Sequence, residues 1–290
     1  MSFSTELKES LSKITNLKNK EEVKYEFLGY LISNNITITN KKIAYTTTNE
    51  YNINRFNKLL SNMNITDFNI ELKGKKYKIT FKKPEPIDEI EISNEILLNK
   101  KLKNDEKLER ALIRGVFLGS GNMNDPLNKY HLEVSIPNEK NVEIIKKMLE
   151  EKGINIKKLE KKKGYSLYLK DGEEISKFLA FIEANSAVLK FEEIRVIREM
   201  KNNINRKVNC ETANLNKTVN AAVRQIEAIK KIKKKGKFEN LPENLKEIAK
   251  LRIDNPDASL IELGQMLKKP LGKSGVNHRL NTLLQLGEEL

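Results

Sequence analysis

The sequence has a single cysteine, Cys210, and only two histidines among its 290 residues. One cysteine excludes an intrachain disulfide and any metal site built from several cysteines, which favours a reducing compartment. No uncharged apolar run approaches the roughly 18 residues that indicate a membrane span. The first ten residues contain Glu6 and Lys8 where a secretory signal would have an apolar core. We therefore expect a cytoplasmic protein with no membrane segment.

Positive charge is concentrated in one short part of the chain. The formal net charge is +14, of which residues 201–240 contribute +8, from 11 basic and three acidic side chains. Residues 1–200 contribute +6, and residues 241–290 are neutral. A basic segment beside a folded module is typical of proteins that bind a polyanion, most often nucleic acid. A solvated lysine-rich helix is the alternative explanation.

The first 200 residues contain one pattern of elements twice. Hydrophobic periodicity predicts a helix from Glu21, two short strands, a helix opening at Asn49 and a hairpin turning at Gly74. The same order begins again at Leu108, with its second helix opening at Asn138 and a closing helix after the second hairpin. A repeat of this kind predicts two similar halves.

The predicted fold class is α+β, a duplicated αββαββα domain with halves at residues 1–100 and 101–201. Each half packs helices on one face of a small antiparallel sheet and leaves the other face open. The first helix of each half carries two small residues one turn apart, so we expect these two helices to cross closely. The small residues are Gly29 with Ser33, and Gly115 with Gly119.

A basic linker helix is predicted over residues 202–240. Its apolar side includes Val219, Val223, Ile226 and Ile229. Some cations at its end suit the helix dipole, but six exceed what that explanation requires. The candidate DNA-binding lysines of this segment are Lys230, Lys231, Lys233, Lys234, Lys235 and Lys237.

Residues 241–290 are predicted to form an all-α domain of three helices. The first buries Leu245, Ile248, Ala249 and either Leu251 or Ile253. The second begins at Ser259, which forms a capping box with Glu262.

The last two predicted helices have the pattern of a helix-turn-helix, with hydrogen-bonding residues near the start of the final helix. Arginine can bind guanine, asparagine can bind adenine, and lysine, serine and histidine suit phosphate oxygens. A three-helix cap whose polar face meets water is the alternative. The candidate DNA-binding residues here are Lys273, Ser274, Asn277, His278, Arg279 and Asn281.

Two segments of the first domain, FLGYLISNN (27–35) and IRGVFLGSG (113–121), resemble the LAGLIDADG helices of homing endonucleases. In that family an acidic residue near the end of each helix holds the divalent metals for phosphodiester cleavage. Here the corresponding positions are Asn34 and Ser120. The resemblance therefore implies the fold without the enzyme activity, and without a metal or cofactor. A residual metal-dependent nuclease involving Asp125 is the alternative.

Over its whole length the sequence resembles the WhiA family, most specifically in NRKVNCETANLNKTVNAAVRQ (205–225), NPDASLIELGQML (255–267) and SGVNHRL (274–280). The resemblance implies a nucleoid-associated protein that binds specific sequences in double-stranded DNA. It further implies roles in transcription regulation, cell division and chromosome segregation, with sporulation control in spore formers.

We expect a monomer, with RNA polymerase or division proteins as further partners. A scaffold of the division machinery with incidental DNA affinity is the alternative to a DNA-binding regulator. The open faces of the duplicated sheets could hold DNA, hold a protein or have no ligand, and their surface lysines do not decide between these.

Overall fold

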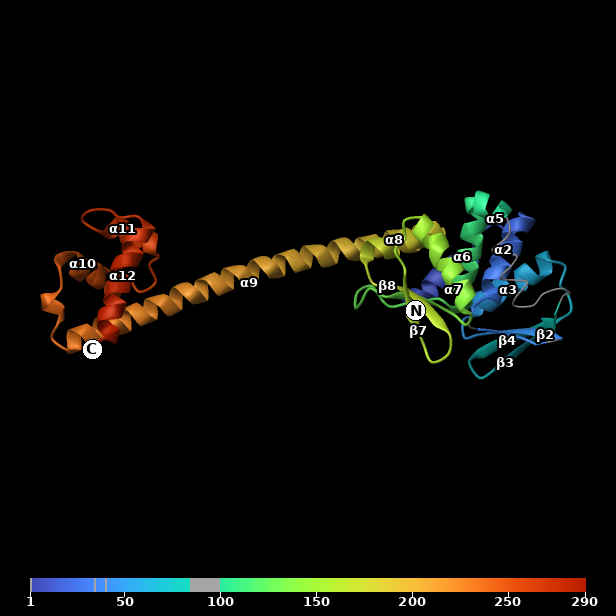
Figure 1. Ribbon diagram of the computed structural model, residues 1–290, viewed down its shortest axis with the longest axis horizontal. Coiled ribbons are helices and arrows are strands. Elements are labelled where there is room, and N and C mark those ends of the chain that lie inside the picture. The colour runs from blue at the N-terminus through green and yellow to red at the C-terminus, as the bar shows by residue number, and fades with distance from the viewer. Residues whose placement is uncertain (1, 34, 40, 84–99) are drawn as a thin grey trace. The chain divides into compact units, whose positions relative to one another are not determined.

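The chain is divided into two compact units, Met1–Glu199 and Met200–Leu290, each with its own hydrophobic core (Figure 1). We describe each unit by itself. The computed structural model describes residues 2–33, 35–39, 41–83 and 100–290.

The first half of the N-terminal unit combines helices with an antiparallel sheet whose strand order is β1-β2-β4-β3. Ile43, Tyr45, Ile79 and Phe81 alternate with polar residues along the two central strands and are buried in the core. Two residues, including Gly74 at φ 61°, connect the last two strands, which confirms the predicted hairpin. The described elements are α1 (Phe3–Ser12), α2 (Lys20–Leu31), β1 (Ile36–Ile38), β2 (Lys42–Thr47), α3 (Glu50–Asn62), β3 (Phe68–Lys73) and β4 (Lys76–Lys82).

The second half repeats this arrangement, with the strand order β5-β6-β8-β7. Leu132, Val134, Ile136, Leu167 and Leu169 fill its core from the two central strands. The identical strand orders confirm the predicted duplication and the α+β class. The described elements are α5 (Lys100–Asn104), α6 (Glu106–Ser120), β5 (Asn122–Met123), β6 (Leu132–Ile136), α7 (Glu139–Glu151), β7 (Lys157–Glu160), β8 (Tyr165–Leu169) and α8 (Gly172–Phe181).

Asparagine side chains start the corresponding helices of the two halves. Asn49 accepts a hydrogen bond from the backbone N–H of Asn52, and Asn138 accepts one from that of Asn141. Both predicted starts are confirmed. Helix α1 was not predicted, although its buried Phe3, Leu7 and Leu11 recur every four residues.

Helices α2 and α6 cross in close contact because glycines lie at the crossing. A Cβ added to Gly115 would lie 2.0 Å from the carbonyl oxygen of Glu26, and one added to Gly29 would lie 2.2 Å from that of Leu112. A Cβ on Gly119 would approach the Ser33 side chain to 2.4 Å. The predicted close crossing is confirmed, and the helix backbones occupy the space that larger side chains would need.

A buried ionic cluster joins three helices beside this crossing. The Glu26 carboxylate of α2 accepts hydrogen bonds from Nε of Arg55 in α3 at 2.7 Å and from Nε of Arg114 in α6 at 3.1 Å. Glu26 and Arg114 are 0% exposed and Arg55 is 1% exposed. Burial by itself raises the pKa of Glu26, but the hydrogen bonds from Arg55 and the charges of both arginines hold it below its ordinary value.

The long helix α9 (Asn185–Lys234) begins in the N-terminal unit and ends in the C-terminal unit. The sequence between these residues contains neither proline nor glycine, so the asparagine-rich stretch at residues 202–216 remains helical. No helix in the described part of the chain has the combined length and apolar character needed to cross a bilayer. The elements after α9 are η1 (Phe238–Asn240), α10 (Glu243–Asp254), α11 (Leu260–Met266) and α12 (Lys273–Glu288).

The C-terminal core lies between the end of α9 and α10 to α12. Ile229 and Ile232 of α9 are buried in it, so the basic segment is packed along one side. On α10, Leu245, Ile248 and Ala249 face inward as predicted. The fourth inward residue differs from the expectation: it is Arg252, whereas Leu251 and Ile253 are only partly buried. Arg252 follows Leu245 by seven residues, which places both on one helix face.

Candidate nucleic-acid interface

A tight helix-turn-helix positions α12. Ser259 and Glu262 form the predicted capping box at the start of α11. At the end of α11, the backbone N–H of Leu271 donates to the carbonyl oxygen of Gly264 at 3.1 Å. A Cβ on Gly264 would lie 2.1 Å from the Leu271 carbonyl oxygen, so this turn requires glycine. Because the turn closes this tightly, α12 has a defined position against α11.

Five of the six predicted contact residues on α12 are exposed: Lys273, Ser274, Asn277, His278 and Asn281. The opposite side of α12 is buried through Val276, Leu280 and Leu283. Arg279 is only partly exposed, and its Nη1 donates to the backbone carbonyl oxygen of Asn244 in α10 at 3.4 Å. Arg279 would have to leave this bond to contact a base, whereas Asn277 and Asn281 are already free to do so.

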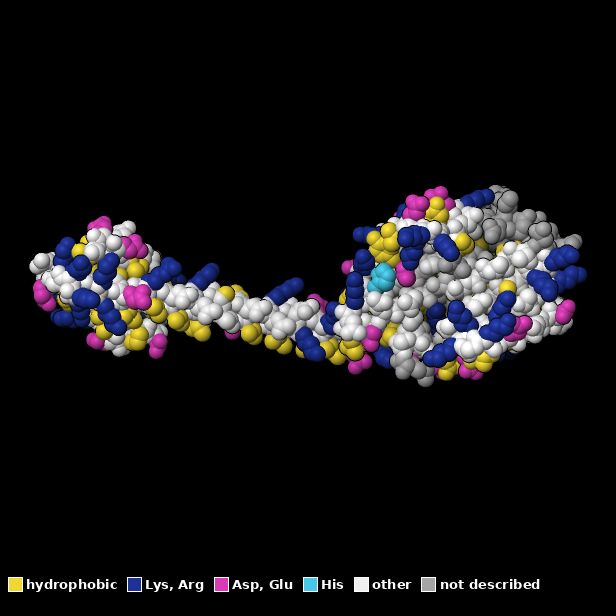
Figure 2. All heavy atoms as spheres, turned by 90° about the horizontal axis from the view of Figure 1, so that it is seen from below, with side chains coloured by type: hydrophobic (Ala, Val, Ile, Leu, Met, Phe, Trp, Pro, Cys, Tyr) yellow, Lys and Arg dark blue, Asp and Glu magenta, His cyan; other side chains and the backbone are white. Residues whose placement is uncertain are grey.

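The predicted basic segment is exposed at all six of its lysines, which are Lys230, Lys231, Lys233, Lys234, Lys235 and Lys237. Lys233 has a structural contact as well, because its Nζ lies 4.9 Å from the centroid of the Phe238 ring. Lysine and arginine side chains are spread over the face of the C-terminal unit that is visible in Figure 2, with acidic side chains mostly toward its edges. Such a surface suits a polyanion.

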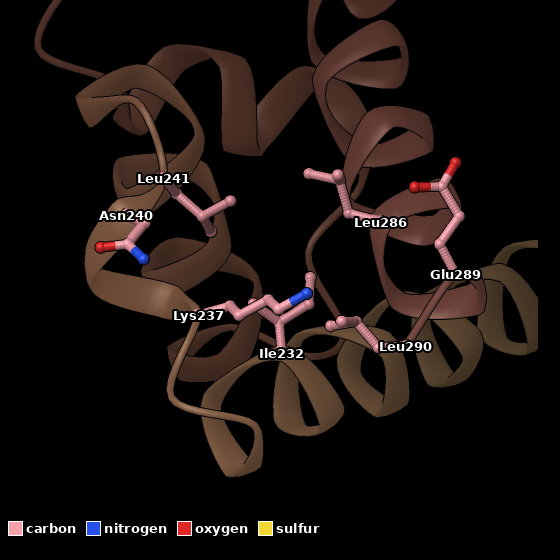
Figure 3. Close-up of a pocket in the computed structure, with 7 residues that line it drawn as sticks. All are labelled: Ile232, Lys237, Asn240, Leu241, Leu286, Glu289 and Leu290. Atoms are coloured by element: carbon pink, nitrogen blue, oxygen red, sulfur yellow. The ribbon is translucent and has the colours of Figure 1, made fainter.

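One of these lysines, Lys237, lies at a pocket that polar and apolar residues line together (Figure 3). The pocket has a volume of about 290 Å³ and lies between the end of α9 and the C-terminal part of α12. Ile232, Leu241, Leu286 and Leu290 supply its apolar lining, and the Lys237 side chain extends over Ile232. The pocket lies at the other end of α12 from Lys273, Ser274 and Asn277, so it is not part of the candidate interface.

The positions that correspond to the endonuclease acids have different surroundings. Asn34 lies outside the described residues. Ser120, at the end of α6, donates through Oγ to the carbonyl oxygen of Ser135 at 2.6 Å and accepts from the Ser135 N–H at 3.2 Å. Ser120 therefore ties α6 to β6. Within the described ranges, no group of three or more His, Cys, Asp or Glu side chains is placed to hold a metal ion.

The structure brings two predicted residues, Lys273 and Asn277, together with three that were not predicted. Lys217 and Gln225 of α9 and Arg252 of α10 line a second pocket beside the start of α12. The signal for Arg252 was present in the sequence, since a charged residue occupies a helix position that continues an apolar face. Lys217 and Gln225 could not be placed there, because periodicity does not show which part of α9 lies beside the start of α12.

Comparisons with known proteins match both parts of the chain. Residues 109–201 match the family model described as WhiA LAGLIDADG-like domain, and residues 204–287 match that of the WhiA C-terminal HTH domain. A relative named "Probable cell division protein WhiA" from Staphylococcus aureus (strain JH9) is 38% identical over 312 residues, covering 100% of this chain and 98% of its own length.

A second relative of the same name, from Clostridium acetobutylicum, is 50% identical over 186 residues. That alignment covers 64% of this chain and 59% of the relative, so the match spans about three fifths of the clostridial protein. The crystal structure of full-length DUF199/WhiA from "Thermatoga maritima" has a TM-score of 0.62 at 29% identity and covers 100% of this chain and 99% of that one. The chain therefore belongs to the WhiA family, with a LAGLIDADG-like N-terminal domain and a C-terminal helix-turn-helix domain.

Proposed function

We propose that this protein binds specific sequences in double-stranded DNA through α12 and thereby regulates transcription. The exposed hydrogen-bonding face of α12, fixed on its buried apolar side, is the observation that carries the proposal. Asn277 and Asn281 lie one turn apart on this face, and an asparagine amide can bind N6 and N7 of adenine. The match to a helix-turn-helix family supports the same function.

The cellular role that we propose is in cell division and chromosome segregation, with sporulation control in spore formers. The names of the relatives support the first of these. In this role the protein is nucleoid-associated in the cytoplasm, and RNA polymerase or division proteins are its further partners. The N-terminal unit contributes to this role without cutting DNA, because Asn34 and Ser120 lack the carboxylates that would bind catalytic metals.

Replacing Asn277 by alanine tests the assignment of α12. We expect Asn277→Ala to cost about 1–3 kcal/mol at the preferred site, because alanine cannot form the bidentate hydrogen bonds to the base. Binding to a scrambled duplex of equal length should change little. Fluorescence anisotropy at fixed salt measures both affinities. Gln285→Ala, at an exposed amide near the other end of α12, is the matched control. Equal losses on the two duplexes would assign Asn277 to backbone contacts only.

Neutralising the basic segment should weaken binding to all duplexes, whereas Asn277→Ala should weaken binding to the preferred site only. The combined change of Lys230, Lys231, Lys234 and Lys235 to glutamine removes exposed charges and leaves the buried Ile229 and Ile232 in place. We expect weaker binding to every duplex. In a plot of log K against log salt, the magnitude of the slope should fall by about one for each phosphate that the variant no longer neutralises. Affinities at four salt concentrations measure this slope, and an unchanged slope would show that these lysines do not contact DNA.

A further inference from the structure

Four helices of the C-terminal unit surround a half-open pocket of about 280 Å³, and we propose that this pocket binds a phosphate group. Lys217 of α9, Arg252 of α10 and Lys273 of α12 give its lining three cationic side chains. In the described part of the chain, no carboxylate side chain lines the pocket, and none of the three cations has a salt-bridge partner. A pocket with this charge balance attracts a multiply charged anion.

Arg252 supplies the strongest reason to expect an anion here. The residue is 2% exposed, and its Nη1 donates to the carbonyl oxygens of Ala258 at 2.7 Å and Pro256 at 3.3 Å. Its Nε has no hydrogen-bond partner among the described residues. Burial lowers the pKa of the Arg252 guanidinium, and no buried carboxylate offsets that cost. An unpaired buried cation is unfavourable, so an anion in the pocket would stabilise the C-terminal unit.

Gln225 indicates which kind of phosphate fits. It is 3% exposed, and its Oε1 lacks a hydrogen-bond partner among the described residues. An amide oxygen only accepts hydrogen bonds. Near pH 6, inorganic phosphate and phosphate monoesters carry a P–OH that can donate to it. A phosphodiester within a DNA backbone has no such proton. With Oε1 presented to the ligand, Gln225 favours a free phosphate or monoester over a backbone phosphate.

The N-terminal end of α12 lies at the pocket through Lys273. Lys273 is the first residue of α12, and the preceding Gly272 provides no side-chain cap for the N–H groups of the first turn. Free N–H groups at the start of a long helix bind phosphate well. The carboxylate of Glu262 accepts a hydrogen bond from the Ser259 N–H at 2.7 Å, so it caps α11 and does not cap α12.

Two lining residues, Lys273 and Asn277, also belong to the proposed DNA-contacting face. A phosphate bound between them and Arg252 would therefore change how α12 meets DNA, which couples the two ligands. This consequence rests on the proposed function. The binding of phosphate itself does not.

Titration of the full chain with inorganic phosphate tests the proposal. At pH 6 and constant ionic strength, with chloride replaced by phosphate, we expect saturable heat by calorimetry and a higher melting temperature of the C-terminal unit. Lys217→Gln should weaken phosphate binding about tenfold, as expected for loss of a charged hydrogen bond. Lys207→Gln, an exposed lysine of the same helix outside the pocket, should change it less than about twofold.

Other outcomes of this titration are equally decisive. The absence of saturable binding, or equal losses in Lys207→Gln and Lys217→Gln, would overturn the proposal. If Arg252→Gln folds, it should abolish phosphate binding. If it does not fold, Lys217→Gln alone tests the proposal. Since the titration contains no DNA, its failure would leave the proposed DNA binding intact.

A DNA experiment separates the two sources of phosphate. If the pocket takes a free phosphate or monoester, phosphate should shift the affinity of wild-type protein for a duplex, and Lys217→Gln should remove that shift. If it takes a backbone phosphate instead, Lys217→Gln should weaken all duplexes about tenfold, without saturable binding of inorganic phosphate. The second outcome would overturn the preference for a monoester that we infer from Gln225.

Discussion

Glu26→Gln is expected to destabilise the N-terminal unit by about 3–5 kcal/mol, because it leaves buried arginines without their shared carboxylate. The change keeps the shape of the side chain and removes its charge. Arg55 and Arg114 would remain at 1% and 0% exposure, with the hydrogen bonds at 2.7 and 3.1 Å weakened or broken. A loss of this size is a large fraction of the stability of an ordinary domain.

Tyrosine fluorescence during urea unfolding measures this effect selectively. All eight tyrosines precede residue 170, and the chain has no tryptophan, so the signal reports on the N-terminal unit alone. Glu9→Gln, which breaks the exposed Glu9–Lys13 pair of the same unit, should leave the transition unchanged. A transition of Glu26→Gln that matches that of Glu9→Gln would contradict the assigned role of the cluster.

The stability of wild type and that of Glu26→Gln should depend differently on pH in acid. The pKa of Glu26 is lowered in the folded state, so its carboxylate contributes stability above the unfolded pKa of about 4.3. That contribution is lost as the pH falls through the lower, folded pKa. The gap in unfolding free energy between wild type and Glu26→Gln should therefore narrow below about pH 4. A gap that stays constant with pH would show that folding does not lower the pKa of Glu26.

Gly264→Ala should have the largest effect on the C-terminal unit, a loss of about 3 kcal/mol. The new Cβ would lie 2.1 Å from the carbonyl oxygen of Leu271, and a backbone atom cannot move aside without opening the turn. Displacement of the turn would also move α12, so we expect specific DNA binding to fall with stability. Because the C-terminal unit has no tyrosine, its unfolding is the transition that far-UV circular dichroism detects and tyrosine fluorescence does not.

Gly275→Ala is the matched control in the same unit. A Cβ there would meet the Leu271 side chain at 3.6 Å, which is ordinary contact. Since alanine favours a helix more than glycine, this change should raise stability by up to about 1 kcal/mol. Equal stabilities of the two alanine variants would show that the turn is looser than the structure indicates.

The duplicated fold could be predicted because its signals are local. Asn49 and Asn138 start helices through their own side chains, and Gly74 sets a hairpin turn. The small residues Gly29 and Gly115 also predicted a contact between two helices far apart in the sequence. Glycine inside a helix lowers its stability, so a close crossing is the reason to have it there. Periodicity and capping together predicted the repeated order of helices and strands from Glu21 onward, but not helix α1 before it.

Features that depend on tertiary contacts could not be predicted in the same way. Glu26 and Arg114 belong to different halves, and no pattern within either helix shows that their side chains meet. Arg252 was passed over in favour of Leu251 or Ile253, because an arginine on an apolar face is assumed to be exposed. The partial burial of Arg279 depends on the position of α10, which the sequence does not reveal.

Selection of duplexes from a random pool by the full chain tests the central claim most directly. We expect wild-type protein to enrich one sequence motif. The double variant Asn277→Ala, Asn281→Ala should retain general affinity for duplexes and enrich no motif. Enrichment of the same motif by both proteins, or of no motif by the wild type, would contradict the claim that α12 recognises DNA sequence.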